Sequence, residues 1–387
     1  MKYRLKDIAI LKYGKNQKNV VSDAGTVPIY GTGGLMAYAI QALYDKPSVL
    51  IGRKGTIDKV RYVTHPFWTV DTLFYTIINE DIVRPHFFYY LMTQVDLLKL
   101  NEGTTIPSLR TETLNRIEFD IPSLTIQDQI LSVIEPVEEK IELNNKINDN
   151  LLEQAQTILT SFFIDFSHFD GVVPADYERG TLQDIADFSN GYAFKSKELL
   201  DAPEPDCYHV FKQGHINRGG GFNSSGTKSW YPISKCINLS KYVLQKGDVL
   251  MAMTDMKDNV AILGNTALMT EDNKYIVNQR VGLLRSNGYK KTSYAYIYLL
   301  TNSFDFLKDL RSRANSGVQV NLSSTEIKSS PIWIAPDTIN DEFNALTEPL
   351  LSMIMNNDLE NQRLADLREC LLPQLMSGEL DVSNLDF

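Results

Sequence analysis

The chain has 387 residues, of which 43% are hydrophobic and 22% charged, and its formal net charge is −10. A chain of this length and composition can bury two separate hydrophobic cores. No run approaches the ~18 apolar residues that a membrane span needs, and the N-terminal stretch MKYRLKDIAI lacks the apolar core of a signal peptide. Three scattered cysteines argue against a disulfide framework. We therefore expect a cytoplasmic protein without membrane segments.

The sequence contains a long internal repeat. The pattern of residues 5–14 returns 177 positions later at 182–191, and the Glu-Pro pair at 135–136 returns at 348–349, an offset of 213. Such a unit is far longer than the 20–50 residues of a solenoid repeat. A whole globular domain and the helix after it are thus predicted to be duplicated, with extra residues inserted in the second copy.

Charge divides the chain at the same places. Residues 1–123 and 171–336 each carry +3, whereas residues 124–170 carry −7 and residues 337–387 carry −9. We expect two globular domains in the basic segments, a central helical spacer at 124–170 and a distal helical spacer at 337–387. Only the basic domains could lie against a polyanion without electrostatic cost. The alternation favours a nucleic-acid hypothesis, although solvated helix faces would give the same charges.

Both acidic segments have the apolar spacing of a coiled coil, with alternating steps of four and three residues from Ile130 onward. Each has two asparagines in the middle of this series. Antiparallel pairing of the two helices places Asn144 beside Asn361 and Asn148 beside Asn357. Buried asparagines fix the register, because any slipped alignment sets an amide against aliphatic carbon. The alternative is that the asparagines face solvent.

The same alignment places Phe162 against Phe343. Pro136 and Pro349 stand at matched positions, and each is expected to kink or start its main helix because proline removes a helical donor. A helix from about residue 138 to 163 spans roughly 40 Å at ~1.5 Å per residue. This length is close to the ~34–36 Å of one turn of B-DNA, so the helices could space two DNA-binding domains.

The globular segments read as mixed α/β, with a twisted, partly antiparallel sheet in each. Helical stretches are expected at 85–100 and 292–311. The β-rich runs between glycine-bearing turns are 48–51, 68–78, 249–253 and 276–284. The predicted fold class is α+β, with two mixed α/β domains in tandem pseudo-twofold repeat, separated by two long helices that pair as an antiparallel coiled coil.

Motifs for catalysis are missing from the sequence. It has no GxxxxGK[ST] phosphate loop, no HExxH motif, no dinucleotide fingerprint and no Asn-Pro-Pro-aromatic tetrapeptide. The five histidines form no ligand-spaced cluster, and the glycines of residues 30–34 indicate a tight loop rather than a phosphate cradle. We therefore expect no cofactor, no metal and no catalytic residue in this chain.

Polar loops suited to DNA contact are present in both halves. Arg53 and Lys54 follow a β run and can pair with guanine O6/N7 or with phosphate. The candidate DNA-binding residues of the first half are Tyr30, Thr32, Gly33, Arg53, Lys54, Thr104, Thr105 and Arg110. Those of the second half are Lys212, Gln213, His215, Asn217, Arg218, Gln279, Arg313, Gln319 and Asn321. Ordinary surface polarity explains any one of them, but their concentration in loops that differ between the copies favours DNA.

Several stretches resemble the DNA specificity subunits of type I restriction-modification systems. They are LLEQAQTILTSFFIDF at 151–166, LRECLLPQLMSGELDV at 367–382, IYGTGGLMAY at 29–38, SVLIGRKGT at 48–56 and GTTIPSLR at 103–110. The duplication with two long helices is also the architecture of that family.

The resemblance implies that residues 1–123 and 171–336 are target-recognition domains. Each would recognise one half of an asymmetric bipartite site in double-stranded DNA, while the paired helices space the domains and dock two methylation subunits. ATP-driven nuclease subunits would join for cleavage, and the catalytic residues would lie in these partners. Two other functions remain open from the residues themselves: a coiled-coil adaptor that binds only proteins, and an enzyme with an unrecognised active site.

Overall fold

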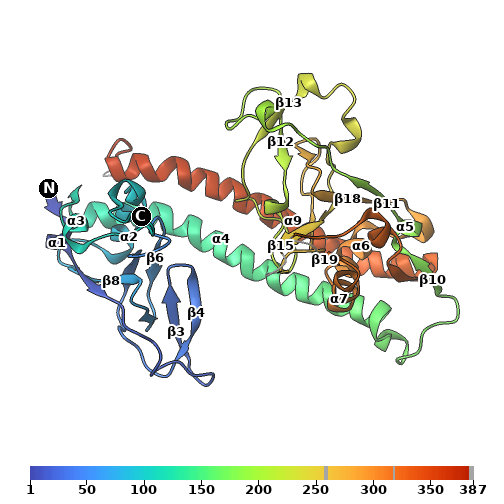
Figure 1. The fold of residues 1–387 in the computed structure, drawn as a ribbon, viewed down its shortest axis with the longest axis horizontal. Helices are drawn as coiled ribbons and strands as arrows, with labels where there is room; N and C mark the ends of the chain where they lie inside the picture. Colours follow the sequence, from blue (N-terminus) through green and yellow to red (C-terminus); the bar gives the residue numbers. More distant parts are fainter. Residues whose placement is uncertain (257–259, 317–318, 383–387) are drawn as a thin grey trace. The chain divides into compact units, whose positions relative to one another are not determined.

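The computed structural model describes residues 1–256, 260–316 and 319–382. Its contacts divide the chain into two compact units, Met1–Glu139 with Leu364–Phe387, and Lys140–Arg363. Each unit holds one globular domain, a part of the long helix α4 (Leu124–Leu159) and a part of the long helix α9 (Asp337–Ser377) (Figure 1). The division between the units therefore falls inside both helices.

The globular part of the first unit is built from three small sheets. The strands in a four-stranded antiparallel sheet are, in spatial order, β2 (Ala9–Tyr13), β8 (Leu73–Ile78), β5 (Ser48–Gly52) and β6 (Val60–Val63). A three-stranded sheet has the order β4 (Gly34–Ala39), β3 (Val27–Gly31) and β7 (Trp68–Thr69), with β3 and β7 parallel. The remaining elements are β1 (Lys2–Arg4), its partner β9 (Glu118–Asp120), and the helices α1 (Leu5–Ile8), α2 (Pro85–Thr93) and α3 (Thr111–Leu114).

The second unit repeats this arrangement. Its four-stranded sheet has the order β11 (Ala186–Asn190), β18 (Val281–Ser286), β14 (Val249–Ala252) and β16 (Thr266–Leu268). Its three-stranded sheet has the order β13 (Trp230–Pro232), β12 (Cys207–Phe211) and β17 (Tyr275–Val277), again with one parallel pair, β12 and β17. The outer pair is β10 (Glu178–Thr181) with β21 (Pro331–Ile334), and the helices are α5 (Leu182–Ile185), α6 (Tyr294–Thr301), α7 (Phe304–Ser312) and α8 (Ser324–Lys328).

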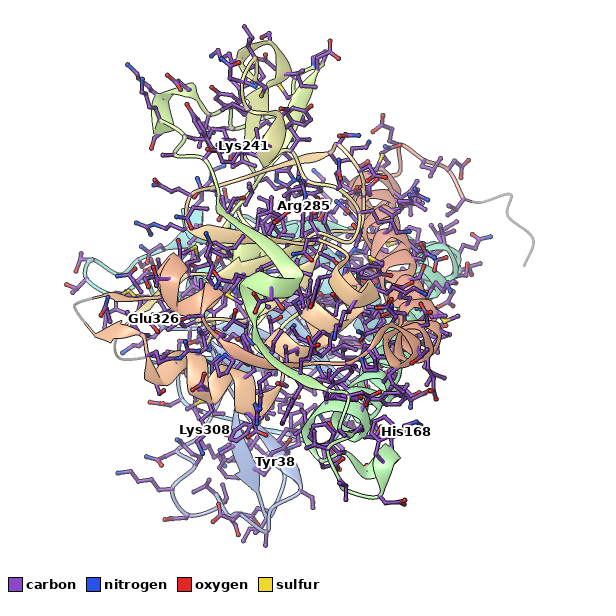
Figure 2. The ribbon with its side chains drawn as sticks, turned by 90° about the vertical axis from the view of Figure 1, so that its right-hand side faces the viewer. Tyr38, His168, Lys241, Arg285, Lys308 and Glu326 are labelled. Atoms are coloured by element: carbon purple, nitrogen blue, oxygen red, sulfur yellow. The ribbon has the colours of Figure 1, made fainter. Side chains whose placement is uncertain are left out.

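One further sheet of the second unit has no named counterpart among the strands of the first. It has the order β15 (Thr254–Met256), β20 (Gln319–Asn321) and β19 (Asn315–Ser316). Elsewhere in the second unit, Arg285 on β18, which is labelled in Figure 2, pairs its Nε with Oδ1 of the buried Asp248 at 2.7 Å. This charge pair ties the start of β14 to β18, because Asp248 immediately precedes β14.

Two of the predicted β-rich runs are interrupted at equivalent points, so each holds two strands. The run 68–78 breaks where the amide of Leu73 bonds to the carbonyl of Val70, and the run 276–284 breaks where Val281 bonds to Asn278. Both breaks contain polar residues that turn the chain out of the sheet. The helical stretch at 292–311 is likewise two helices, α6 and α7, and that at 85–100 is α2 followed by a 3₁₀ turn, Leu97–Leu100.

The long helices complete the core of each unit. In the first, Ile130 and Ile134 of α4 are buried in the same cluster as Leu372 and Leu375 of α9. In the second, Leu159 of α4 and Leu351 of α9 are buried in one cluster. The apolar faces of the helices are thus covered by globular domain and partner helix together. No helix among the described residues combines the length and apolar character required to cross a bilayer.

The asparagines in the second unit form the expected pairs. Asn144 Nδ2 donates to Asn361 Oδ1 at 2.9 Å, and Asn357 Nδ2 donates to Asn148 Oδ1 at 2.8 Å. Asn144 is only 1% exposed and Asn148 only 9%, so these two do not face solvent. Further along, the rings of Phe162 and Phe343 meet edge to face at 5.8 Å. The helices therefore pair antiparallel in the alignment that the repeat predicts.

The prolines do not start the helices. Pro136 lies inside α4, which begins at Leu124, and Pro349 lies inside α9, which begins at Asp337. A proline within a helix removes one donor, but here the long helix and its packing continue past it. Of the two predicted effects, a helix start at the proline was wrong, and a kink stays a prediction.

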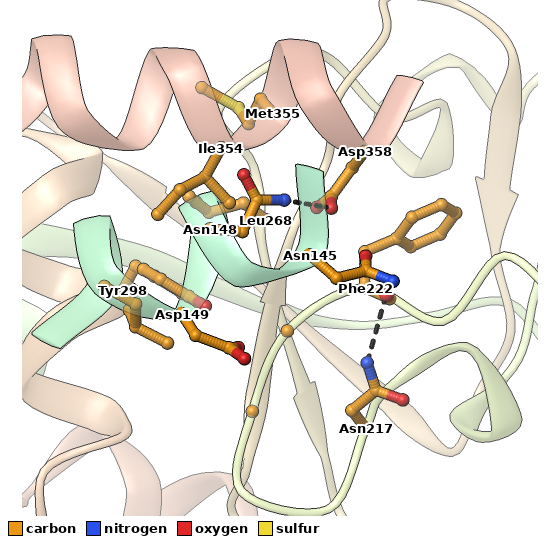
Figure 3. Close-up of a pocket in the computed structure, with 13 residues that line it drawn as sticks. Asn145, Asn148, Asp149, Asn217, Phe222, Leu268, Tyr298, Ile354, Met355 and Asp358 are labelled. Atoms are coloured by element: carbon orange, nitrogen blue, oxygen red, sulfur yellow. Dashed lines mark hydrogen bonds between the residues drawn. The ribbon is translucent and has the colours of Figure 1, made fainter. Parts of the chain in front are cut away.

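A carboxyl group adjoins the asparagine pairs. Asn148 Nδ2 also donates to Asp358 Oδ1 at 2.9 Å (Figure 3). Burial raises the pKa of Asp358 to about 6 from its usual 3.8, and the hydrogen bond from Asn148 offsets this only in part. Because the pKa is higher in the folded than in the unfolded chain, the contribution of Asp358 to stability is full below pH 3.8 and is lost as the pH rises through about 6.

We predict that Asp358→Asn stabilises the chain at pH 8 by about 1–2 kcal/mol, since one pKa unit corresponds to ~1.4 kcal/mol and the side chain is partly exposed. The amide keeps an acceptor for Asn148 and carries no charge. Urea unfolding of both proteins at pH 5 and pH 8 measures the effect, and the gain should shrink at pH 5. An equal difference at the two pH values would contradict this account.

Candidate nucleic-acid interface

Three stretches of the first domain that were predicted to contact DNA converge in the structure. The amide of Gly55 donates to the carbonyl of Pro107, and the amide of Leu109 donates to the carbonyl of Arg53, both at 2.9 Å. Thr32, in the turn between β3 and β4, places its Oγ1 3.7 Å from the position of a Cβ on Gly55. We call residues 30–34, 53–56 and 103–110 the first-domain loop cluster.

The basic side chains of the first-domain loop cluster differ in the protein groups that they contact. Arg53 Nη1 donates to the carbonyl of Asp71 at 2.8 Å, and its guanidinium lies 5.0 Å from the centre of the Tyr13 ring. Arg110 pairs with Glu102 at 3.1 Å. Lys54 is exposed beside them. Arg53 thus supports the loop, whereas Lys54 presents its ammonium group to solvent, where phosphate or a guanine edge could reach it.

The other predicted residues of this cluster are two loop threonines, a turn glycine and a tyrosine. Thr104 and Thr105 are exposed at the tip of their loop, and Gly33 is exposed in the hairpin turn. Tyr30 is partly buried, and its hydroxyl lies 3.1 Å from His65 Nε2. Burial raises the pKa of the Tyr30 phenol, so it stays protonated and able to donate. The cluster therefore offers hydroxyls, backbone groups and cations on one surface.

Exposed apolar residues next to the turn were missed in the sequence. Leu35 is 53% exposed and Met36 58% exposed on β4, directly after the turn glycines. Apolar residues in a strand are usually assigned to the core from their alternation with polar residues, so the sequence did not indicate that these two side chains are exposed. Such side chains can contact thymine methyl groups.

In the second domain, the turn between the equivalent strands is replaced by residues 212–229. Gln213 from this insertion makes two hydrogen bonds to Thr254, from its Nε2 to the carbonyl at 2.5 Å and from the Thr254 hydroxyl to its Oε1 at 2.7 Å. Lys212, Gln213 and Gln279 line one cavity of about 680 Å³, together with Asn278 and Arg280. The predicted Lys212, Gln213 and Gln279 thus come together in one concave site, which apolar residues such as Phe194 also line.

The repeat explains why this cavity lies where it does. Val49-Leu50 matches Val249-Leu250, so Thr254 holds the position of Lys54. The backbone of Lys54 forms an isolated β-bridge with that of Ser108. In the second domain the backbone of Thr254 pairs with that of Asn321, which is the counterpart of Ser108 at an offset of 213. The offset between the strands could have identified Thr254. Arg280, which is exposed, was also missed.

The prediction that His215 contacts DNA was wrong. His215 is fully buried, with its ring packed near those of Phe211 and Phe222. The amide of Lys212 donates to its Nδ1 at 3.0 Å. Burial lowers the pKa of His215 to about 4, so the ring is neutral. Its position in a polar segment hid the fact that its flanking aromatic residues enclose it.

Two more predicted residues lie apart from the cavity of Gln213. Asn217 donates from Nδ2 to the carbonyl of Phe222 at 3.1 Å and lines a second cavity of about 220 Å³, with Asp358 and other residues of the helix pair (Figure 3). Arg313 contacts Asp309 at 2.7 Å and Glu326, which is labelled in Figure 2, at 3.3 Å. Its guanidinium holds α7 and α8 together, so Arg313 is not a free cation for DNA.

The remaining predicted residues of the second domain are Arg218, Asn321 and Gln319. Arg218 is exposed on the turn after Asn217. Asn321 lies on β20 opposite Thr254. The side chain of Gln319 lies outside the part of the structure that is described, although its backbone pairs with Met256.

Matched glycines support the loops of both domains. A Cβ on Gly14 would lie 2.0 Å from the carbonyl oxygen of Val70, and one on Gly191 would lie 2.2 Å from that of Asn278. Each carbonyl belongs to the turn that interrupts a β run. Only glycine permits this approach of the two backbones.

We predict that Gly14→Ala lowers the free energy of unfolding by about 1–3 kcal/mol, because the methyl group displaces backbone that is packed on both sides. Chemical denaturation of the full chain measures the loss. Gly33→Ala is the matched control: a Cβ there meets no atom within 4 Å. A loss that is the same in both variants would argue against the packing explanation.

Comparison with known proteins gives a consistent result. The family model of the type I restriction modification DNA specificity domain matches residues 1–153 and 174–367. The chain is 25% identical over 362 residues to the type I restriction enzyme MjaIX specificity subunit of Methanocaldococcus jannaschii, covering 89% of this chain and 80% of that protein. It is 23% identical over 378 residues to the HindI specificity subunit of Haemophilus influenzae, covering 78% and 79%.

A solved structure has the same fold. The S subunit of the type I restriction-modification system from M. genitalium matches with a TM-score of 0.63, covering 97% of this chain and 95% of that one. The sequence identity over this match is 16%, so the likeness concerns the fold alone.

Proposed function

Because the chain belongs to the family of type I restriction-modification DNA specificity domains, we propose that each of its two domains binds one half of an asymmetric, bipartite site in double-stranded DNA. The chain is a DNA specificity subunit. The observation that carries the proposal is the convergence of polar and basic loops at equivalent places in both domains, around Lys54 in the first and Thr254 in the second.

Different surfaces support different half-sites. The first domain has a short hairpin turn with exposed Leu35 and Met36 beside Lys54. The second has a concave site with amides and the exposed Arg280. Amide side chains favour adenine, Arg and Lys favour guanine, and apolar groups favour the thymine methyl. The two domains therefore select different base sequences.

The helices are proposed to space the domains and to dock two methylation subunits. Both long helices contribute to each of the two units. In the second unit they also carry large apolar side chains at the surface of an acidic segment: Leu143 is 52% exposed on α4, and Met353 is 51% exposed on α9. Exposed apolar groups rimmed by charges are typical of protein interfaces. Motor and endonuclease subunits would join the same complex in the cytoplasm.

In this proposal the chain supplies specificity and no catalytic group, and methylation and cleavage take place in the partners. A cofactor-binding assay on the isolated chain tests the alternative of an enzyme. A coiled-coil adaptor is the other alternative, and it would show no sequence preference in DNA binding. The target itself can be identified by methylation-sensitive sequencing of the native genome.

We predict that Lys54→Ala in the methylation complex weakens binding to the native target, since one base or phosphate contact contributes roughly 1–3 kcal/mol, or about 5- to 150-fold in Kd. Substitutions in the second half-site should remain as costly as for the unaltered complex. Fluorescence anisotropy with matched DNA duplexes measures both. Lys6→Ala, which removes an exposed charge from α1 of the same domain, should leave the affinity unchanged.

Arg280→Ala is expected to show the reverse pattern, with the discrimination at the second half-site reduced. Affinity that is unchanged in both Lys54→Ala and Arg280→Ala would contradict the assignment of the two surfaces.

The helix pair offers a separate test of spacing. Four residues inserted after Asn148, with four inserted before Asn357, keep the asparagine pairs matched and lengthen both helices by ~6 Å. The preferred spacer between the half-sites should then grow by about two base pairs, while both half-sites stay the same. Selection from a library of DNA duplexes with variable spacers measures this preference. An unchanged spacer would contradict the spacing role.

A further inference from the structure

An ionic cluster joins the first domain to its helices. His86 on α2 lies between two carboxylates of α4: its Nδ1 is 2.7 Å from Glu135 Oε1 and its Nε2 is 3.4 Å from Glu138 Oε2. The hydroxyl of Tyr90 donates to Glu138 at 2.7 Å. On the other side, Arg368 of α9 pairs with Glu138 at 3.2 Å. One domain helix and both long helices thus meet in a single network within the first unit.

The geometry requires a particular protonation state of His86. Both ring nitrogens face carboxylate oxygens, and only the imidazolium has a proton on each nitrogen. A neutral ring would turn a bare nitrogen lone pair toward one of the carboxylates. The His86 side chain is only 19% exposed, so water replaces the lost contact poorly.

The surroundings of the ring hold it in place. Tyr62 of β6 stacks on one side and Tyr90 of α2 on the other, each with its ring centre 4.6 Å from that of His86. The titratable and charged groups that face His86 are Glu135 and Glu138 from α4 and Tyr62, Tyr89 and Tyr90 from the domain, with Arg368 beyond Glu138. The carboxylates are thus the only groups among these that favour the charged ring.

The second copy of the repeat lacks this cluster. The counterparts of His86, Glu138 and Arg368 are Tyr294, Leu351 and Ala155. Leu351 and Ala155 are both fully buried in the core of the second unit. The second junction keeps one carboxylate, Glu348 in the place of Glu135, but it has no counterpart of the imidazole, of the second carboxylate or of the guanidinium.

From this contrast we propose that protonation of His86 controls the attachment of the first domain to its helix pair, and that the second domain has no such control. The junction closes when the imidazole is charged and loosens when it loses a proton. The proposal concerns the joint inside the first unit, so it stands independently of the DNA that either domain binds.

The electrostatics fix the direction of the effect. Burial lowers the pKa of His86, but the carboxylates of Glu138 and Glu135 outweigh burial and raise the pKa above its usual 6.5. The stabilisation from His86 is therefore full below pH 6.5 and is lost as the pH rises through the pKa of the folded protein. For Glu138, burial raises the pKa, but His86, Tyr90 and Arg368 lower it below 4.5 overall, so its charge persists throughout this range.

The titration of His86 can be measured directly in the full chain. The sequence has five histidines, so selective isotope labelling of histidine gives few NMR signals, and His86→Gln identifies the signal of His86. We expect the imidazole to titrate above pH 6.5. A titration below 6.5 would overturn the proposal.

Hydrogen exchange tests the mechanical consequence. Between pH 6 and pH 8, after correction for intrinsic rates, the protection of α2 should fall by about tenfold for each unit by which the pKa of His86 is raised. The equivalent helix α6 is an internal control in the Asp358→Asn background, which removes the titration of Asp358 beside Tyr298 of α6, and it should then show no such change. Equal pH dependence of α2 and α6 would overturn the proposal.

A repeat-based variant separates charge from packing. His86→Tyr, Glu138→Leu and Arg368→Ala together give the first junction the residues that the second already has. The protection of α2 should then become independent of pH. If this variant fails to fold, the single His86→Gln variant must also abolish the pH dependence, and persistence of the dependence in that variant would contradict the role of His86.

Discussion

The paired amides of Asn144 with Asn361 and of Asn148 with Asn357 fix the alignment of α4 against α9 in the second unit, and the position of every element packed on these helices depends on that alignment. An amide left without a partner inside a helix interface costs more than the hydrogen bond itself contributes. Any sliding of α4 against α9 would break both pairs at once. Apolar layers alone would tolerate a shift by one heptad, since they look alike, so the amides and not the apolar residues make the alignment unique.

A single framework carries two different surfaces. The sheets of both domains have the same strand order, and Gly14 and Gly191 hold the same turn against the same carbonyl. The differences are the further sheet of β15, β20 and β19 in the second domain and the connections, above all the segment 212–229 in place of the turn Thr32-Gly33. Insertions at such places cost little stability because the loop ends stay close together. The framework can therefore keep its core while the binding surface changes.

The duplicated pattern predicted the helix pairing, the duplicated domains and the loops that converge around Lys54, because these depend on periodicity and on turn residues that are visible in one sequence. It did not predict that His215 is buried or that Arg313 is bound to Asp309 and Glu326. Both are polar residues in polar segments, and their partners lie on other elements. Local pattern carries no information about such tertiary contacts.

The contrast between the two junctions follows from the energetics of buried charge. A buried ion pair pays for desolvation and often stabilises less than an apolar contact of equal volume. In the second copy the corresponding contacts are made by Leu351 and Ala155, which carry no charge that pH or salt could change. In the first copy, Glu138 and Arg368 are desolvated at the junction. The contacts of Glu138 with His86 and Tyr90 offset part of that desolvation cost. The second copy shows that the junction forms without these charges. Their presence in the first copy alone therefore indicates that the strength of the first junction depends on solution conditions.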